Sequence, residues 1–268
     1  MIPKTIHYCW VGGNPLPDSA KKCIASWKKY CPDYEIVEWN ETNYDFTKIP
    51  YMKEAYDAKK WGFVPDYARL DIIYTHGGIY LDTDVEIVKS FDPLLHLKGF
   101  AGFQDNKEVA LGLGFGAEAG NTVIKILMDS YEALSFLQSD GTPDLTPSPQ
   151  LNTAVLVQNC GLMQNGKYQD MNGLAIFPTE YFCPKSFEDG VIRKTRKTYS
   201  IHHFDASWYT DEQRKAMYHR WDNYKEINRR KNKRKHKLWR RRVFGGFFRR
   251  LFGDERWERF KARIFKRR

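Results

Sequence analysis

Short apolar runs and longer amphipathic stretches alternate along most of this chain. Runs rich in β-branched and aromatic residues predict strands at residues 2–10, 34–39, 79–81, 85–88, 100–103, 109–117, 175–177 and 199–204. Stretches with apolar positions three or four residues apart predict helices at residues 17–30, 51–61, 65–76, 122–137 and 150–159. Because strand and helix alternate near the start of the chain, we expect an α/β fold, with a single wound mixed sheet flanked by helices.

Two carboxylates, Asp82 and Asp84, stand between two of the predicted strands. Side chains two residues apart in an extended chain face the same way, so these two carboxylates can converge. Converging carboxylates repel unless a cation or a shared proton lies between them. Mg²⁺ and Mn²⁺ are typically bound by one or two carboxylates together with substrate phosphates. The motif therefore indicates a metal–diphosphate site, although two solvated turn aspartates would have the same spacing.

The helix predicted at 65–76 leads directly into this motif. Pro65 suits its first turn and Gly77 suits its C-terminal cap. Asp66 and Arg69 are three residues apart, so they share one face of the helix. An ordinary surface ion pair has the same spacing, but here the helix position lets this face point into the pocket of Asp82 and Asp84.

Asp66-x-x-Arg69 followed by Gly77-Gly78-x-Tyr80-Leu81-Asp82-x-Asp84 resembles the sugar-binding region of family-32 glycosyltransferases with a DXD motif. The opening segment 2–13 and the later segment 203–208 are also similar to that family, so the resemblance covers about residues 1–210. It implies a GT-A-like fold and a retaining hexosyltransferase. It further implies a nucleotide-sugar donor, with a UDP-sugar favoured over a GDP-sugar, and Mn²⁺ or Mg²⁺ as cofactor.

The resemblance also implies roles for individual residues. It places the sugar and the reaction on Asp66, Arg69, Asp82 and Asp84, and the nucleotide against His7, Trp10, Tyr80, Asp82, Ser207 and Trp208. Independently of the resemblance, Asn152 in the helix predicted at 150–159 is a candidate polar contact to the donor sugar or the acceptor. His203, five residues before Trp208, corresponds to a third metal ligand beside Asp82 and Asp84, and His202 is expected to point the opposite way. A core tryptophan at position 10 and two half-buried histidines at a strand end are the structural alternatives.

Glycines alternate with apolar residues in the strand predicted at 109–117, at Gly112, Gly114 and Gly116. One face of this strand is therefore bare, as the close approach of a ligand or of another backbone requires. Tight packing against a neighbouring element explains the pattern equally well.

The net charge of +10 is unevenly distributed along the 268 residues. Residues 229–268 contain 19 Lys or Arg and three Asp or Glu, a balance of +16, so residues 1–228 carry −6. We therefore expect a catalytic domain at 1–225 and a basic, aromatic, amphipathic helical tail at 226–268, broken at Gly245–Gly246 and Gly253. Such a tail suits an anionic membrane surface. Nucleic acid fits the charge but not the apolar face, and docking on the protein itself or on a second copy is the structural alternative.

The five cysteines are odd in number and lack C-x-x-C spacing, which favours reduced thiols in a cytoplasmic protein. No run of about 18 apolar residues predicts a membrane span, and the chain opens on a strand pattern, so we expect no signal peptide. Together these features predict an enzyme peripheral to the inner face of a bacterial membrane. It would glycosylate a saccharide or lipid-linked saccharide in surface (capsular) polysaccharide synthesis.

One other enzyme class has an apolar run followed by Asp-x-Asp, the haloacid-dehalogenase-type phosphatases, in which Asp82 would be the nucleophile. That fold normally begins with this strand and needs a later Lys and a second acidic pair. Here about 80 residues precede the motif and no later Asp pair stands out, so the transferase is favoured.

Overall fold

The computed structural model describes residues 1–206, 209–253, 255–256 and 259. The chain divides into two compact units, Met1–Arg214 and Lys215–Arg268, a boundary that precedes the one expected at 225/226. The elements in chain order are β1 (Thr5–Cys9), α1 (Asp18–Tyr30), β2 (Glu35–Trp39), α2 (Pro50–Asp57), α3 (Pro65–His76), β3 (Gly78–Tyr80), β4 (Val85–Ile87), η1 (Asp92–Leu94), β5 (Gly99–Phe103), β6 (Val109–Ala110), β7 (Phe115–Ala117), α4 (Thr122–Ser130), α5 (Ser148–Cys160), β8 (Gln169–Asp170), β9 (Ala175–Phe177), α6 (Thr179–Phe182), β10 (Ser200–His202) and α7 (Asp211–Phe252).

The main sheet of the first unit is mixed. Its strand order is β2-β1-β3-β7-β5-β9-β8, with β6 paired to β5. The pairs β1–β2, β1–β3 and β5–β9 are parallel, and the remaining pairs are antiparallel. The predicted α/β class with a mixed sheet is therefore confirmed. A second sheet contains only β4 and β10, which pair antiparallel with Val85 opposite His202.

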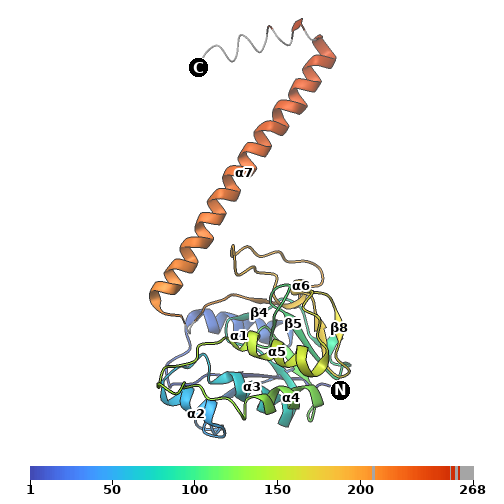
Figure 1. Cartoon of the computed structure of the whole chain (residues 1–268). Helices are drawn as coiled ribbons and strands as arrows, with labels where there is room; N and C mark the ends of the chain where they lie inside the picture. The colour runs from blue at the N-terminus through green and yellow to red at the C-terminus, as the bar shows by residue number, and fades with distance from the viewer. Residues whose placement is uncertain (207–208, 254, 257–258, 260–268) are drawn as a thin grey trace. The chain divides into compact units, whose positions relative to one another are not determined.

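Helices cover the main sheet, and α2, α3 and α4 lie together on one side while α1 lies on the other (Figure 1). The helices α2 and α4 both pack against α3, and α1 packs against β4. Trp27 of α1 is fully buried, and its indole N–H donates to the carbonyl of Val85 at 2.7 Å. This bond fixes the start of β4, the strand that follows the two aspartates.

Several expected elements are shorter in the structure, and two of them show a clear local cause. The strand predicted at 109–117 is divided into β6 and β7, because Gly114 has φ +120, outside the range of a strand. The helix predicted at 122–137 ends at Ser130. The Glu54 carboxylate accepts hydrogen bonds from the backbone N–H groups of Phe136 and Leu137, so the chain turns back toward α2 instead of continuing the helix.

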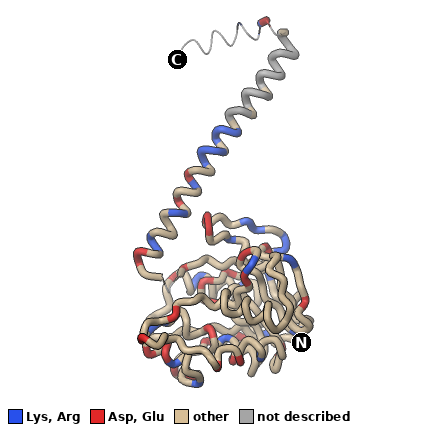
Figure 2. Tube along the Cα trace, viewed as in Figure 1, with Lys and Arg blue, Asp and Glu red and all other residues tan. Residues whose placement is uncertain are grey.

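Helix α7 begins at Asp211 and runs unbroken to Phe252, ending before Gly253 at φ +76. The expected break at Gly253 is confirmed, but the break at Gly245–Gly246 is wrong. Each glycine costs a helix about 1 kcal/mol relative to alanine. The many Lys and Arg around the two glycines are good helix formers and offset this cost. In Figure 2, Lys and Arg recur along the described part of α7, with some Asp and Glu between them. The side chains of all aromatic residues from Phe244 onward lie outside the described set. Within the part of the chain that the structure describes, no helix is apolar over enough length to cross a membrane.

Candidate active site

Asp82 and Asp84 lie in a turn that connects the two sheets. The backbone N–H of Val85 donates to the carbonyl of Asp82 at 3.1 Å, and the N–H of Asp82 donates to the carbonyl of Gly112 at 3.1 Å. The expected extended backbone is therefore replaced by a tight turn. The two carboxylates still converge, because β3 belongs to the main sheet and β4 to the small one, and the chain must change direction between them.

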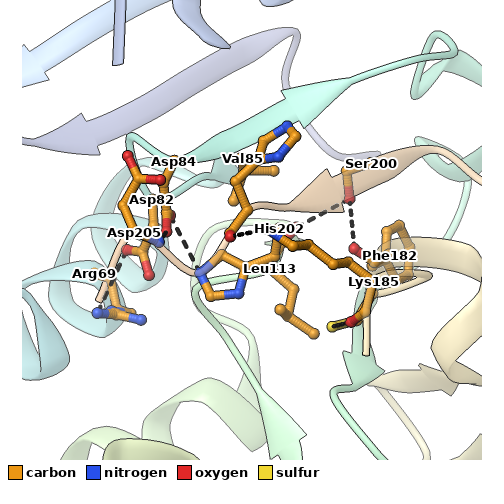
Figure 3. A network of polar contacts seen from close by, with 12 residues as sticks. Arg69, Asp82, Asp84, Val85, Leu113, Phe182, Lys185, Ser200, His202 and Asp205 are labelled. Carbon is orange, nitrogen blue, oxygen red and sulfur yellow. Dashed lines mark hydrogen bonds and ion pairs between the residues drawn. The ribbon is translucent and has the colours of Figure 1, made fainter. Parts of the chain in front are cut away.

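Asp84 is held by the end of β10 and the residues after it. Its Oδ1 lies 3.2 Å from Nε2 of His202, and its Oδ2 accepts a hydrogen bond from the backbone N–H of Asp205 at 2.9 Å. Figure 3 shows the imidazole of His202 directed at this carboxylate. Burial alone would raise the pKa of Asp84, but His202 and the Asp205 N–H outweigh it and lower the pKa to about 2. Asp84 is therefore ionised at neutral pH.

The structure brings His202, and not His203, to the aspartates. Nε2 of His203 lies 2.9 Å from the Glu86 carboxylate, on the other side of the segment. Consecutive residues at a strand end face opposite ways, so only one of the two imidazoles can face Asp84. The expected opposition of the two histidines is present, but His202 rather than His203 faces the aspartates, since the β4–β10 register sets His202 opposite Val85.

The backbone after His202 is strained. Phe204 and Ala206 both have positive φ, at +56 and +48, a conformation that is rare for residues other than Gly and Asn and that recurs at functional sites. The Phe204 ring packs edge-on against His202 with centroids 4.3 Å apart. This conformation turns the Asp205 N–H toward Asp84, so the strained segment orders the carboxylate.

Asp66 and Arg69 form a buried ion pair on α3, 3.0 Å apart, with only 3% and 5% of each residue exposed. Arg69 Nη2 also lies 3.5 Å from Oδ1 of Asp82, and its Nε–H donates to the carbonyl of Pro65 at 3.0 Å. Burial raises the pKa of Asp66 to about 6, although Arg69 and Ser148 favour its ionised form. The α3 face therefore points at the acidic turn, as the sequence indicated.

Gly112 explains part of the glycine alternation. A Cβ at this position would lie 1.9 Å from Oδ2 of Asp82 and 3.0 Å from Nη1 of Arg69. A Cβ at Gly116 would instead meet Phe100 at 2.8 Å and the carbonyl of Gly78 at 2.9 Å. The bare face thus serves the candidate site at Gly112 and core packing at Gly116.

Asp82, Asp84 and His202 each present one ligand atom within 4.8 Å of the others. Two carboxylates and an imidazole form a donor set that suits Mn²⁺, and the carboxylates alone suit Mg²⁺. The Asp82 side chain is 30% exposed and the other two are less so, so a ligand can approach from the Asp82 side.

Several other predicted residues support the site from within the core. His7 is buried, and both ring nitrogens already bond to the protein: Nδ1 accepts from the Trp39 indole at 3.1 Å and Nε2 donates to the Gly77 carbonyl at 3.0 Å. No nitrogen of His7 is left for a nucleotide. Tyr80 is also buried, and the Arg69 guanidinium lies over its ring at 5.1 Å. The structure places both residues as packing partners.

Trp10 and Asn152 have different surroundings. Trp10 is half-buried after β1, and its indole N–H donates to the carbonyl of Asn14 at 2.6 Å. Asn152 is 1% exposed on α5. Ser207 and Trp208 lie outside the described residues. The contacts that His202 and Gly112 make with the two aspartates were not expected from the sequence, because both depend on strand register.

Residues 17–100 match the family model described as glycosyltransferase sugar-binding region containing DXD motif, which confirms the resemblance over this part of the chain. The chain is 39% identical over 103 residues to inositol phosphoceramide mannosyltransferase 3 of Schizosaccharomyces pombe, covering 35% of this chain and 28% of that protein. It is 29% identical over 104 residues to mannosyl phosphorylinositol ceramide synthase SUR1 of Saccharomyces cerevisiae, covering 37% and 27%. The chain thus spans less than a third of the length of these relatives. Among solved structures, it is similar to the PaToxG glycosyltransferase, with a TM-score of 0.44 and 22% identity over 60% of this chain and 70% of that one.

Proposed function

We propose that this protein is a metal-dependent glycosyltransferase that moves a hexose from a nucleoside diphosphate sugar to a saccharide or lipid-linked acceptor. One observation supports the proposal most strongly. The cluster of Asp82, Asp84 and His202 contacts the buried Asp66–Arg69 pair, because Arg69 lies 3.5 Å from Asp82. Asp82 and Asp84 lie inside the region that matches the sugar-binding family.

Asp82, Asp84 and His202 would hold the divalent metal. When bound, the metal neutralises charge that develops on the leaving diphosphate. Asp84 is ionised and oriented by His202 and the Asp205 N–H before any ligand arrives, so the carboxylate loses little entropy on binding.

Arg69 and Asp66 would hold the donor sugar. The guanidinium is fixed by Asp66, Asp82 and the Pro65 carbonyl, and a fixed guanidinium presents its remaining N–H donors in a defined direction. Asp66 accepts hydrogen bonds from sugar hydroxyls when ionised. Together they restrict which face of the anomeric carbon meets the acceptor. Retention of configuration is proposed from the family resemblance alone.

A turnover assay tests this function. Wild-type protein is incubated with UDP-glucose, UDP-galactose, UDP-N-acetylglucosamine or GDP-mannose, with Mn²⁺, Mg²⁺ or EDTA, and released nucleotide and sugar are measured. GDP-mannose belongs in the panel because the relatives are named for mannosyl transfer. We expect one donor to be hydrolysed or transferred, with loss of activity in EDTA and in Asp82→Asn. The exposed Asp57→Asn is the matched control and keeps activity. Turnover that survives EDTA and Asp82→Asn contradicts the proposal.

The acceptor and location form a separate part of the proposal. We place the enzyme at the inner face of a membrane, with a lipid-linked or surface-polysaccharide acceptor. The +16 balance of residues 229–268 and the ceramide lipids in the relatives' names support this placement. Each basic residue near an anionic membrane contributes about 1 kcal/mol.

Liposome flotation tests the location. Full-length protein should float with phosphatidylserine liposomes and not with phosphatidylcholine liposomes. Replacing the exposed Lys231, Lys233 and Lys235 by Glu should reduce flotation and leave turnover on a soluble acceptor unchanged. Equal flotation of the wild type and the variant contradicts the membrane assignment.

A further inference from the structure

A hairpin at residues 184–193, between α6 and β10, has no role in the function described so far. The backbone N–H of Arg193 donates to the carbonyl of Pro184 at 2.8 Å. One step further along the two arms, the N–H of Ser186 donates to the carbonyl of Val191 at 3.1 Å. The hairpin is therefore closed by its own backbone bonds, and its side chains have defined positions.

The hairpin contacts the strained segment after His202 at two points. The Lys185 ammonium donates to the backbone carbonyl of His203, so its side chain reaches the chain right beside His202 (Figure 3). The Phe187 ring packs edge-on against the Phe204 ring with centroids 5.3 Å apart. The Phe204 ring in turn packs against the imidazole of His202 at 4.3 Å. One polar and one aromatic contact thus connect the hairpin to the neighbourhood of a candidate metal ligand.

The segment needs such support. Phe204 and Ala206 have positive φ, and this conformation persists in non-glycine residues only where the surrounding structure over-determines it. The backbone N–H of His203 donates to the carbonyl of Asp84 at 3.0 Å, and the N–H of Asp205 donates to the Asp84 carboxylate at 2.9 Å. A change in this segment therefore moves the groups that orient Asp84.

We propose that Lys185 and Phe187 are positioning residues for the divalent cation. They hold segment 203–206 in its strained conformation, so that His202 and the backbone of the segment keep Asp84 in place before the metal arrives. Both residues act through this segment and not as metal ligands. This inference rests on the proposed function, because it takes Asp84 and His202 as ligands of the cation.

The charge of Lys185 distinguishes this role from a simple electrostatic one. Its ammonium is bonded to the residue next to His202, so it repels a cation bound there. Removing that charge alone would strengthen Mn²⁺ binding. Releasing the segment weakens Mn²⁺ binding, by about tenfold if Lys185 acts as other residues that orient metal ligands do. The direction of the change in Mn²⁺ affinity therefore separates the two roles.

Mn²⁺ binding to the full-length protein, measured by electron paramagnetic resonance of free Mn²⁺ with and without UDP, tests the proposal. We expect the dissociation constant for Mn²⁺ to rise about tenfold in Lys185→Met, which loses the ammonium but keeps an unbranched side chain, and in Phe187→Ala. Lys185→Arg keeps a cationic donor and should restore most of the affinity. Donor turnover in Lys185→Met should need more Mn²⁺ to reach half its maximum, and the rate at saturating Mn²⁺ should be kept.

Lys194→Met is the matched control. Lys194 is exposed directly after the hairpin, so the same substitution removes an equal charge, and Mn²⁺ affinity should not change. If the wild type binds Mn²⁺ and Lys185→Met or Phe187→Ala binds it at least as tightly, even with a lower melting temperature, the role of that residue is refuted while the metal site stands. An equal loss of affinity in Lys194→Met also refutes the role of Lys185. If the wild type binds no Mn²⁺, the proposed metal-dependent function fails and this inference fails with it.

Discussion

The variant Gly112→Ala should displace the Asp82 carboxylate without destabilising the fold, so it tests whether turnover depends on the position of Asp82. The added Cβ would lie 1.9 Å from Oδ2 of Asp82, and ordinary contact begins at 3.4 Å, so the carboxylate must move by about 1.5 Å. The Asp82 side chain is 30% exposed and can swing outward without moving backbone. A misplacement of about 1 Å at a reacting centre can cost about 100-fold in rate. We therefore expect donor turnover to fall by about that factor, with little change in melting temperature.

Gly116→Ala is the counterpart in the same glycine series. Its Cβ would meet Phe100, which is fully buried, and the backbone carbonyl of Gly78, and neither can move aside easily. Overpacking of this kind costs about 1–3 kcal/mol, and each kcal/mol lowers the melting temperature of a domain this size by about 2–4 °C. Turnover per folded molecule should be kept. Equal turnover of Gly112→Ala and wild type would refute the idea that Asp82 must stay where it is.

Two further predictions concern stability. Burial lowers the pKa of His7 from 6.5 to about 4, so as pH falls the imidazole is protonated in the unfolded chain before it is in the folded protein. The free energy of unfolding of the wild type should therefore fall by about 3 kcal/mol as pH drops from 6.5 to 4. His7→Gln should lose this part of the pH dependence in urea denaturation, and an unchanged dependence of stability on pH would contradict a buried neutral imidazole. Glu54→Ala removes the acceptor for the N–H groups of Phe136 and Leu137. Urea denaturation should show its free energy of unfolding lowered by about 1–3 kcal/mol, whereas Glu132→Ala, at an exposed position, should leave it almost unchanged.

The local patterns predicted most of the fold. Helix α3 begins at Pro65 and is capped by Gly77 at φ +66, as expected from those two residues. The strands before and after Asp-x-Asp were predicted from their β-branched residues, and spacing alone placed Asp66 and Arg69 on one face. These features depend on neighbours in the sequence, which is why the sequence predicts them.

The features that the sequence did not predict depend on contacts between distant segments. The choice of His202 over His203 follows from the pairing of β10 with β4, more than a hundred residues apart in the chain. The turn at Asp82 follows from the separation of β3 and β4 into two sheets. The early end of α4 follows from the carboxylate of Glu54 on α2. No local periodicity encodes such long-range pairings.

We propose that one divalent cation is bound by Asp82, Asp84 and His202. Mn²⁺ binding to the full-length protein, measured by water-proton relaxation with and without UDP, tests this ligand set. We expect His202→Ala and Asp84→Asn to weaken Mn²⁺ binding about tenfold or more, while His203→Ala should bind Mn²⁺ as the wild type does. Undiminished Mn²⁺ binding in His202→Ala, together with loss of binding in His203→Ala, would contradict this ligand set.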